Sequence, residues 1–413
     1  MARAETRGAL SMNISRLHVK NFLSLRNVEV PLGKLNVFIG PNGSGKSNIV
    51  KAIQLLENHA RFGYPTLGGT EIPFTDMVYN FDNYSTMEFH VELSREGEEA
   101  IYSLLVHGNG FKEKMLYKGM LYKSHVTIYE SESESGKFVL SYLSSSNVFR
   151  SPSIYISQAI TYLLRRPDGT VERRPMNLVP SLLRDPPADA HNVLVEASET
   201  LRRFRAFRLS PDSIRGRSDV TFKPDVEHDG GNLARYLLDL YLEERRTFDK
   251  VEDVVRSLVP EVDELVPHIE GTSIELYVKV KGLKLPLRPG FISDGTLRLV
   301  AFAELLHGGF SLVAMEGPEN YVHPRLLEAL VDLARRSPSQ VVFTTHSPRL
   351  LDFVKPEEVF LVSLAPSEAG TETVVRRLAD AKEMEVVKRF LEEGGTLGEA
   401  WISGMFEEGS NRS

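Results

Sequence analysis

The segment GPNGSGKSN, at residues 40–48, combines residue types and a spacing that suit phosphate binding. It matches the pattern G-x-x-x-x-G-K-[ST], in which the backbone N–H groups of a glycine-rich loop surround a phosphate group. The lysine of such a loop reaches the β- and γ-phosphates of a nucleotide, and the hydroxyl after it ligates Mg²⁺. We therefore expect the nucleotide to be bound by Gly40, Pro41, Asn42, Gly43, Ser44, Gly45, Lys46, Ser47 and Asn48, with Lys46 catalytic and Ser47 on the metal.

The residues on either side of this loop form the context that a phosphate site needs. KLNVFIG, residues 34–40, is a mostly apolar strand that leads directly into the loop. Ser47 is expected to open a helix that runs to about Glu57, because apolar residues follow it at helical spacing. The N-terminus of that helix adds partial positive charge beside the phosphate. An ordinary glycine-rich turn is the alternative interpretation, and this context disfavours it.

Two later strands end in side chains that suit a reaction at the phosphate. The apolar strand SLVAM leads to Glu316, and a carboxylate at the carboxyl edge of a sheet would face the Mg²⁺ as a second ligand. The next apolar strand, QVVFTT, leads to His346, which lies 30 residues after Glu316. A neutral imidazole there could hydrogen-bond the γ-phosphate or an attacking water. The alternative for Glu316 is a surface acid at the end of a strand, which the other motifs disfavour, and a lone histidine such as His346 is more often structural.

The segment FISDGTLRLVAFAELL predicts a helix that begins at Ser293, Asp294 and Gly295. Serine and aspartate cap helix N-termini, and the free N–H groups there attract an anion. An ordinary capped helix is the simpler interpretation of this segment by itself. Its position just before the strand that leads to Glu316 favours a second nucleotide-binding element.

The composition sets limits on the kind of protein. The 413 residues, 42% of them hydrophobic, can bury one large core or two ordinary ones. With 49 basic and 56 acidic residues the net charge is −7, so any nucleic-acid contact must come from a local basic patch. The absence of cysteine excludes disulfides and thiolate zinc sites. No apolar run approaches about 18 residues and no signal peptide is visible, so we expect a soluble cytoplasmic protein without membrane contact.

The middle of the chain has the pattern of antiparallel strands. MEFHVEL, residues 87–93, alternates apolar and polar residues, as a half-buried strand does. Two further segments predict hairpins, and the acidic run ESESES at the tip of the second is interpreted as a solvated turn rather than an interaction tail. HNVLVEASETLRRFRAFRL, residues 191–209, is predicted to be one helix. From Ser293 onward helices alternate with strands that are apolar on both faces, which indicates a parallel sheet covered by helices.

Together these motifs resemble the ATP-binding-cassette ATPases of the SMC, RecF and OLD class. LHVKNFLSLRNVEV before the phosphate loop, FISDGTLR, EGPENYVHP, TTHSPRLLD and the ending TLGEAWISG all look like segments of this class. The resemblance implies an α/β fold, a P-loop NTPase head of ABC type with a mixed or parallel sheet flanked by helices. The head would be built from residues 1–60 and 226–413, and residues 61–225 would form an antiparallel β-rich and helical insert.

The resemblance also implies how such a protein works. Two heads of this class join head to tail, and each ATP lies between the P-loop of one head and the signature serine and glycine of the other. Ser293 and Gly295 would then contact the γ-phosphate that Lys46 of a partner chain binds. ATP with Mg²⁺ would hold a homodimer or higher homo-oligomer together, and hydrolysis would loosen it.

Three features depart from this class. Gly317 stands where the second acid of the strand end is expected, so Glu319 and His346 become the candidates for the general base and we expect slow hydrolysis. No clear glutamine of the Q-loop is visible between Arg61 and Ser85. The roughly 245 residues between the loop and Ser293 contain no coiled coil, which excludes a long SMC arm.

Other P-loop proteins fit less well. A transporter's nucleotide domain would be more compact between the loop and the signature segment. About 60 residues follow Val354, too few for the TOPRIM nuclease of full OLD proteins. A P-loop kinase or GTPase does not explain SDGTLR followed by TTHSP, and no N-K-x-D guanine motif is present.

Arginine clusters in the insert are candidates for binding nucleic acid. LLRRPDGTVERRP predicts a hairpin with a Pro-Asp-Gly tip, and LRRFRAFRL interleaves arginines with Phe204 and Phe207. Arginines with aromatic residues could grip a phosphate backbone and stack on bases. A solvated helix whose phenylalanines face the core is the alternative. The candidate arginines are Arg165, Arg166, Arg173, Arg174, Arg202 and Arg203.

Two functions remain open from the sequence. One is an ATPase that acts as sensor or scaffold and controls a separate effector protein, such as a nuclease or toxin, in anti-phage defence. The other is a RecF-like DNA-binding ATPase of DNA repair or maintenance. The missing acid at Gly317 and the short insert favour the first.

Overall fold

The computed structural model describes most of the chain and divides it into two compact units. The first comprises Met1–Gly33, Gly40–Phe204 and Val362–Val375, and the second comprises Lys34–Ile39, Arg205–Leu361 and Arg376–Ser413. Between residues 126 and 177 the description covers the backbone of the strands. The described residues are 12–63, 65, 67, 72–108, 110–118, 126–134, 137–143, 149–150, 159–165, 171–177, 192–221 and 226–406.

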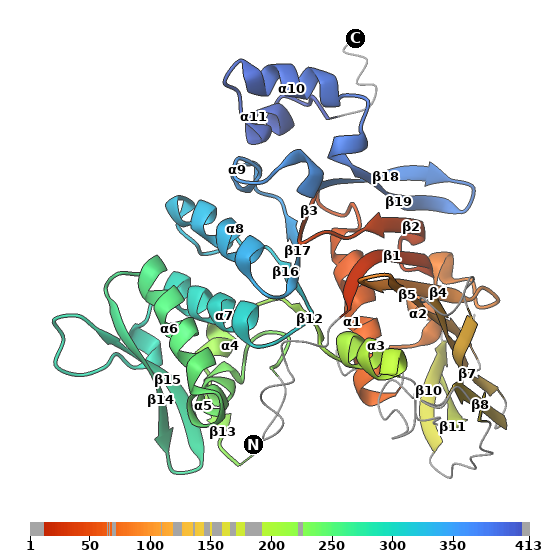
Figure 1. Ribbon diagram of the computed structural model, residues 1–413, viewed down its shortest axis with the longest axis horizontal. Helices are drawn as coiled ribbons and strands as arrows, with labels where there is room; N and C mark the ends of the chain where they lie inside the picture. The colour runs from red at the N-terminus through yellow and green to blue at the C-terminus, as the bar shows by residue number, and fades with distance from the viewer. Residues whose placement is uncertain are drawn as a thin grey trace. The chain divides into compact units, whose positions relative to one another are not determined.

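The first unit contains an antiparallel sheet in the order β2-β1-β4-β5-β6-β7-β8-β9. Figure 1 shows β2, β1 and β4 of this sheet. The alternation predicted in MEFHVEL is confirmed, because Met87, Phe89, Val91 and Leu93 are buried on one face. A separate hairpin, β10 with β11, pairs Arg165 with Val171 and confirms the predicted hairpin around Pro-Asp-Gly. The strands are β1 (Asn13–Phe22), β2 (Leu25–Pro31), β4 (Met87–Arg95), β5 (Glu98–His107), β6 (Gly110–Lys118), β7 (Val126–Glu134), β8 (Lys137–Leu143), β9 (Phe149–Arg150), β10 (Ala159–Arg165) and β11 (Val171–Asn177).

The acidic run ESESES is not a turn, and this part of the prediction is wrong. Residues 130–134 belong to β7, which pairs with β6 on one side and β8 on the other. Backbone hydrogen bonds on both edges hold the strand despite its weak strand propensity, and the alternation of glutamate with serine fits the two-residue period of a strand. The same pairing confirms the predicted hairpin itself, with Glu134 opposite Lys137.

Helices of the first unit lie before and after these strands in the chain. The helix predicted after the glycine-rich loop is confirmed and is longer than expected, since it continues to Phe62 and ends at Gly63, which adopts φ 84°. The predicted helix at residues 191–209 ends earlier, at Arg202. Its helices are α1 (Lys46–Phe62), α2 (Phe74–Met77) and α3 (Asn192–Arg202), with a 3₁₀ turn at Tyr79–Phe81.

Residues 204–207 form strand β12 instead of the end of a helix. The strand lies at the edge of a six-stranded sheet in the order β12-β16-β17-β3-β18-β19, next to β16. Phe204 and Phe207 are buried, so the segment exchanges an exposed helical turn for hydrophobic burial and a strand partner. The strands of this sheet are β3 (Leu35–Ile39), β12 (Phe204–Phe207), β16 (Leu312–Glu316), β17 (Gln340–Thr345), β18 (Val359–Ser367) and β19 (Gly370–Arg377).

The central strands of this sheet are parallel, as the sequence predicts. In the register of β16, β17 and β3, Glu316 lies opposite Thr344, and Thr345 lies opposite Ile39. The carboxyl ends of the three strands therefore meet at one edge of the sheet. Gly40 follows Ile39 directly in the chain, so the glycine-rich loop starts at this edge.

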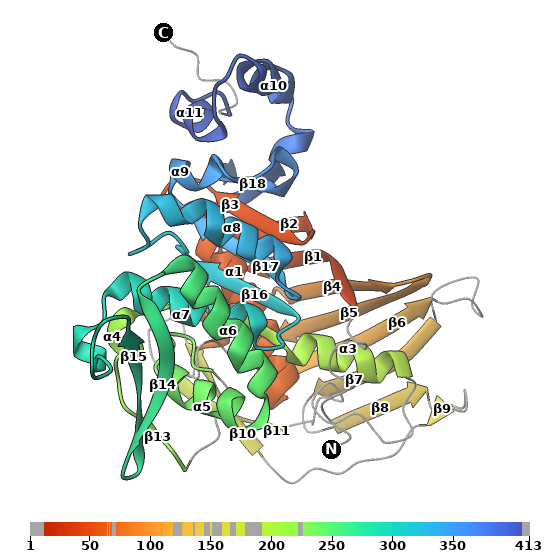
Figure 2. The same ribbon diagram turned by 60° about the vertical axis from the view of Figure 1, so that its left-hand side comes forward.

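Helices and a small antiparallel sheet complete the second unit (Figure 2). The core includes fully buried residues of β3, β16 and β17 together with Leu297, Val300 and Leu305 of α7. No described helix is long and apolar enough to cross a membrane. The elements are β13 (Ser218–Asp219), β14 (Val262–Glu270), β15 (Ser273–Val280), α4 (Pro211–Ile214), α5 (Leu233–Glu243), α6 (Arg245–Leu258), α7 (Asp294–His307), α8 (Leu327–Arg336), α9 (Pro348–Leu351), α10 (Met384–Glu392) and α11 (Leu397–Ile402), with 3₁₀ turns at Pro289–Phe291, Pro324–Leu326, Pro356–Glu358 and Leu378–Asp380.

The fold class predicted from the sequence is confirmed. A mixed α/β architecture contains the parallel strand order that a P-loop ATPase head of ABC type requires, and an antiparallel sheet accompanies it. The predicted domain boundaries at residues 60 and 225 stay a prediction.

Candidate nucleotide-binding site

The glycine-rich loop joins β3 to α1 in a conformation that only glycine adopts easily. Gly43 has φ 77° and Gly45 has φ 100°. At Gly40 the backbone passes so close to its surroundings that a Cβ atom would lie 2.0 Å from the carbonyl oxygen of Val362. All three glycines of the loop therefore have a structural reason, since side chains at these positions would strain or block the loop.

Lys46 lies folded back on the loop that precedes it. Its Nζ donates to the carbonyl oxygens of Gly40 and Pro41, both over 2.8 Å, and lies 3.3 Å from Ser44 Oγ. The side chain is buried, and these oxygens satisfy its charge in the same loop. A phosphate group that replaced these acceptors would attract the ammonium more strongly, because the hydrogen bond would then join two ions.

The start of α7 has the cap that the sequence predicts. Ser293 is the N-cap, and its Oγ accepts from the Thr296 N–H over 3.2 Å. Asp294 forms an ion pair with Arg215, and this partner raises the pKa of the Arg215 guanidinium. At Gly295 a Cβ would lie 2.7 Å from the carbonyl oxygen of Tyr321, so this glycine permits a close backbone approach to the segment after Glu316.

Gly317 is in the left-handed region, and its backbone groups are engaged. It has φ 56°, and a Cβ there would lie 2.2 Å from Asn320 Nδ2. Its N–H donates to the Thr344 carbonyl and its carbonyl accepts from Arg298, each over 2.8 Å. Burial lowers the pKa of that Arg298 guanidinium, while Glu319 and Tyr321 oppose the shift. The local backbone thus favours glycine where an acid is expected.

Glu319 is held at the ends of β16 and β17. Its Oε1 accepts from Thr345 Oγ1 over 2.7 Å and from the His346 backbone N–H over 3.3 Å. Its Oε2 is buried and has no hydrogen-bond partner among the described residues. The imidazole of His346 belongs to an exposed residue. The structure therefore brings Glu319 and the backbone of His346 together, and it leaves one buried carboxylate oxygen without a hydrogen-bond partner among the described residues.

The candidate site residues divide between the two units. Residues 40–48 belong to the first, whereas Ser293, Asp294, Gly295, Glu316, Glu319 and His346 belong to the second. Among the described residues no cluster of three or more histidine, aspartate or glutamate side chains could hold a metal by itself. Ser47 and Glu316 stay the predicted Mg²⁺ ligands.

The sequence did not reveal the residues that support the site. Thr345 and Arg298 lie within the quoted segments TTHSPRLLD and FISDGTLR, but the sequence predicted no supporting role for either side chain. Ser24 lies within the segment LHVKNFLSLRNVEV, where no role was predicted for it, and Thr373, whose Oγ1 contacts the loop at Ser44, lies 329 residues from that residue and matches no motif. Polar side chains next to a motif, such as the TTH before residue 347, are the signal that could have identified Thr345.

The arginine clusters have a mixed outcome. Arg202 and Arg203 both form ion pairs with Glu199 on α3. Phe204 and Phe207 belong to the core, as the alternative interpretation expects, so they are not available to stack on bases. The side chains of Arg165, Arg173 and Arg174, and Arg166 altogether, lie outside the described residues.

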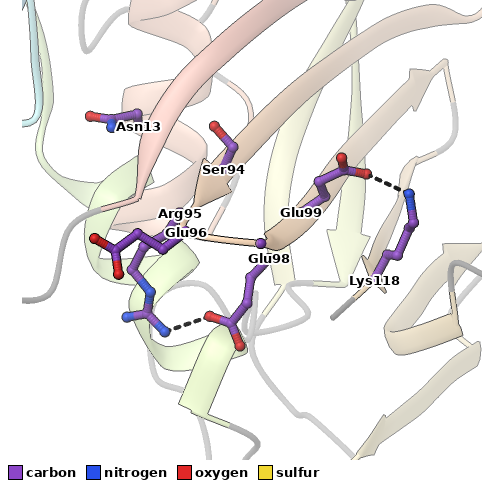
Figure 3. A pocket seen from close by; sticks show the side chains of 8 residues that line it. Asn13, Ser94, Arg95, Glu96, Glu98, Glu99 and Lys118 are labelled. Carbon is purple, nitrogen blue, oxygen red and sulfur yellow. Dashed lines mark hydrogen bonds and ion pairs between the residues drawn. The ribbon is translucent and has the colours of Figure 1, made fainter. Parts of the chain in front are cut away.

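A surface pocket lies at the turn between β4 and β5 in the first unit. Figure 3 shows Arg95 beside Glu98, and Glu99 beside Lys118, with ion pairs of 2.5 and 3.3 Å. Arg95 also pairs with Glu196 of α3. The lining contains no residue of the nucleotide motifs, and four of its charged side chains, Arg95, Glu98, Glu99 and Lys118, form these ion pairs.

Two known proteins resemble the chain over most of its length. An OLD nuclease of Thermus scotoductus is 23% identical over 402 residues, which cover 94% of this chain and 69% of that protein. A solved SMC head, bound to the C-terminal winged-helix domain of ScpA, has a TM-score of 0.52 at 15% identity and covers 90% of this chain and 99% of its own. This second likeness concerns the fold alone.

A family model assigns the chain more directly. It is described as "AAA domain, putative AbiEii toxin, Type IV TA system" and matches residues 35–352, more than half of the chain. The match extends from β3 past the glycine-rich loop to the segment after His346. With the OLD and SMC likenesses it confirms the predicted class, so the chain belongs to this AAA-domain family, within the ABC-type ATPases of the SMC, RecF and OLD class.

Proposed function

We propose that this chain binds ATP with Mg²⁺, hydrolyses it slowly, and uses the bound nucleotide to join two copies head to tail. The dimer would act as a sensor or scaffold that controls a separate effector protein in anti-phage defence. The observation that carries this proposal is the contrast between a complete phosphate loop and Gly317, whose φ of 56° and contact with Asn320 disfavour an acid at that position.

Glu319 is our candidate for the general base. Two donors from the end of β17 hold its Oε1, and the buried Oε2 has no hydrogen-bond partner among the described residues, so we assign Oε2 to the attacking water. The residue stands two positions beyond Gly317, where the acid is expected. A base that reaches the attacking water from this displaced position supports slow rather than absent turnover. His346 contributes a backbone donor to this arrangement.

The face around Ser293 supports contact with a second copy. Phe291 is 77% exposed and Tyr321 is 62% exposed, and both lie beside the predicted signature residues Ser293 and Gly295. Large exposed aromatic residues are common at protein interfaces. In the proposed dimer the N-terminus of α7 would meet the γ-phosphate bound to the partner's loop.

The effector role has more support than DNA binding. Phe204 and Phe207 are buried and do not present rings for stacking, and Arg202 and Arg203 each have Glu199 as a partner, which weakens the arginine–aromatic pattern. The family description names a toxin, and the Thermus relative is named a nuclease. A RecF-like DNA-binding ATPase is the second candidate, and the β10–β11 hairpin with Arg165, Arg173 and Arg174 on its strands favours it.

Mixing two inactive variants tests the head-to-tail arrangement. Lys46→Ala removes the phosphate ligand and Ser293→Arg blocks the opposite half of the site. In a mixed dimer both changes fall in one site and leave the other intact. We expect little turnover from each variant alone and about a quarter of the wild-type rate from an equal mixture, because about half of the dimers are mixed and each keeps one of two sites. No recovery on mixing would contradict a shared site.

Glu319→Gln tests the base. The amide preserves the shape of the side chain and cannot accept the proton, so turnover should fall about 100-fold while the Kd for ATP stays within about twofold. Glu328→Gln on the exposed face of α8 is the matched control. Equal turnover in Glu319→Gln and wild type would transfer the role to another group.

A pull-down identifies the output. The tagged protein is isolated from its host lysate in Mg-ATP and separately in Mg-ADP, and bound protein and nucleic acid are both identified. A stoichiometric protein that depends on the nucleotide supports the effector proposal. Nucleic acid retained only in ATP and lost at high salt would favour the DNA-binding candidate.

A further inference from the structure

A directed chain of hydrogen bonds ends on the backbone of the glycine-rich loop. Asn48 Nδ2 donates to Ser24 Oγ over 2.7 Å, and Ser24 Oγ lies 2.6 Å from Thr373 Oγ1. Thr373 Oγ1 donates to the Ser44 carbonyl over 3.0 Å. Because the single hydroxyl proton of Thr373 is used on Ser44, Ser24 must donate to Thr373. Each hydroxyl then donates once and accepts once.

Three segments distant in sequence form this chain, all within the first unit. Ser24 lies in the turn between β1 and β2, Asn48 in the first turn of α1, and Thr373 in β19. A backbone bond of 2.8 Å from the Thr373 N–H to the Ser24 carbonyl fixes β19 on that turn. Thr373 is 3% exposed, so water does not replace its hydroxyl easily.

The last bond of the chain determines the orientation of one peptide group. The Ser44 carbonyl and the Gly45 N–H belong to the same trans peptide, so they point in opposite directions. With the carbonyl directed at Thr373, the Gly45 N–H points away from Thr373, and it donates to no described residue. A free N–H in a glycine-rich loop before a helix is a donor for phosphate.

Thr373 occupies the space in which a side chain at position 45 would lie. A Cβ on Gly45 would lie 1.9 Å from Thr373 Oγ1 and 2.8 Å from Ser24 Oγ. The two hydroxyls therefore contact the peptide from the side where a side chain would be. They restrict the peptide in the folded protein before any ligand arrives.

We propose that Thr373 is a positioning residue of the phosphate loop, which orients the Ser44–Gly45 peptide so that the Gly45 N–H faces the phosphate chain of a nucleotide. This rests on the proposed function, because it requires that the loop binds a nucleotide. The ligand feature concerned is the β-phosphate, which ATP and ADP share. Loss of the hydroxyl leaves the Ser44 carbonyl without its donor and frees the peptide to rotate.

The test compares two variants at Thr373 with a control on the same strand. Thr373→Val removes the hydroxyl with little change in shape, and Thr373→Ser keeps it. Thr371→Val makes the same change at an exposed position two residues earlier. We expect the Kd for ADP and the Kd for ATP to rise about tenfold in Thr373→Val, to stay within about threefold in Thr373→Ser, and to remain unchanged in Thr371→Val.

The pattern of kinetic constants separates positioning from stability. A positioning role raises KM together with both dissociation constants and changes kcat less, since the donor acts on bound nucleotide throughout. A merely structural role lowers Tm and leaves the two dissociation constants at their wild-type values. That second outcome would overturn the proposal, as would equal effects of Thr373→Val and Thr373→Ser.

Ser24→Ala provides a second route if Thr373→Val does not fold. It removes the donor to Thr373 one step earlier, so we expect the Kd for ADP to rise about threefold. An unchanged Kd for ADP would contradict the proposed chain of hydrogen bonds.

Lys46→Ala distinguishes failure of this inference from failure of the proposed function. If wild type binds ADP, Lys46→Ala does not, and Thr373→Val binds like wild type, only the present inference fails. If wild type binds neither ATP nor ADP, both fail.

Discussion

The glycine-rich loop follows β3 and another segment follows Glu316 at the end of β16, two strands of one sheet that β17 separates, and both segments turn at a glycine with positive φ. In the loop, Gly45 at 100° leaves its N–H without a described partner. After Glu316, Gly317 at 56° uses its N–H on Thr344 and its carbonyl on Arg298. A glycine with positive φ thus leaves an N–H donor without a described partner in the loop, whereas after Glu316 the backbone groups of such a glycine are hydrogen-bonded within the protein.

This difference suggests that nucleotide binding and nucleotide hydrolysis are under separate constraints in this chain. The loop keeps every residue that its pattern requires. The segment after Glu316 has Gly317 at the position where an acid is expected. Glu319, two residues later, accepts a hydrogen bond from Thr345. Changes in the first region should therefore act on affinity, and changes in the second on turnover or on stability.

Gly45→Ala should have the largest effect. The new Cβ would meet Thr373 Oγ1 at 1.9 Å, and alanine is strained at a φ of 100°. We expect ATP affinity, measured by isothermal titration calorimetry, to fall about 100-fold. Gly43→Ala is the control, because Gly43 also has positive φ but no atom lies within 4 Å of its Cβ position. Equal losses in both variants would show that backbone strain alone, without the Thr373 contact, governs the loop.

Thr345→Val should have a moderate effect that is limited to turnover. It removes the 2.7 Å hydrogen bond to Glu319 Oε1 and leaves the carboxylate with a single donor. Loss of one such bond corresponds to about a fivefold decrease in kcat. The Kd for ATP should stay unchanged. A parallel loss of affinity would contradict the separation between the two regions.

Gly317→Ala should act on stability more than on turnover. A Cβ at this position would lie 2.2 Å from Asn320 Nδ2, and the left-handed backbone costs alanine about 1 kcal/mol. We expect a decrease of about 1–2 kcal/mol in the free energy of unfolding, measured by urea denaturation. Gly317→Glu should be destabilised at least as much, so an added acid should not restore rapid turnover. A stable, several-fold faster Gly317→Glu would mean that Asn320 yields and that only the missing acid slows the reaction.

Local pattern was sufficient to predict the loop, the parallel strands and the cap at Ser293, because each depends on residues close in sequence. It was also sufficient to identify Glu319 as a candidate. The helix predicted at residues 191–209 was too long. The choice between helix and strand at Phe204 depends on pairing with β16, more than 100 residues later in the sequence. Thr373 was unpredictable for the same reason. Its role depends on three segments that only the tertiary fold brings together.

Glu304→Gln should have the smallest effect on function and a distinct effect on stability. Glu304 lies on α7, the helix that begins at Ser293 and supplies Arg298 to Gly317. It is fully buried, neither oxygen has a described hydrogen-bond partner, and burial raises its pKa well above the usual value. As pH rises through the unfolded-state value near 4.5, the unfolded chain ionises at this residue while the folded chain stays protonated. The free energy of unfolding therefore falls with increasing pH.

Glutamine does not ionise, so the Tm of Glu304→Gln should exceed that of the wild type by more at pH 8 than at pH 5, with turnover unchanged. Exposed Glu328→Gln should show no such trend. A Tm difference that does not vary with pH would mean that Glu304 has a charged partner in the folded protein. A change in turnover would mean that α7 around Glu304 contributes to hydrolysis.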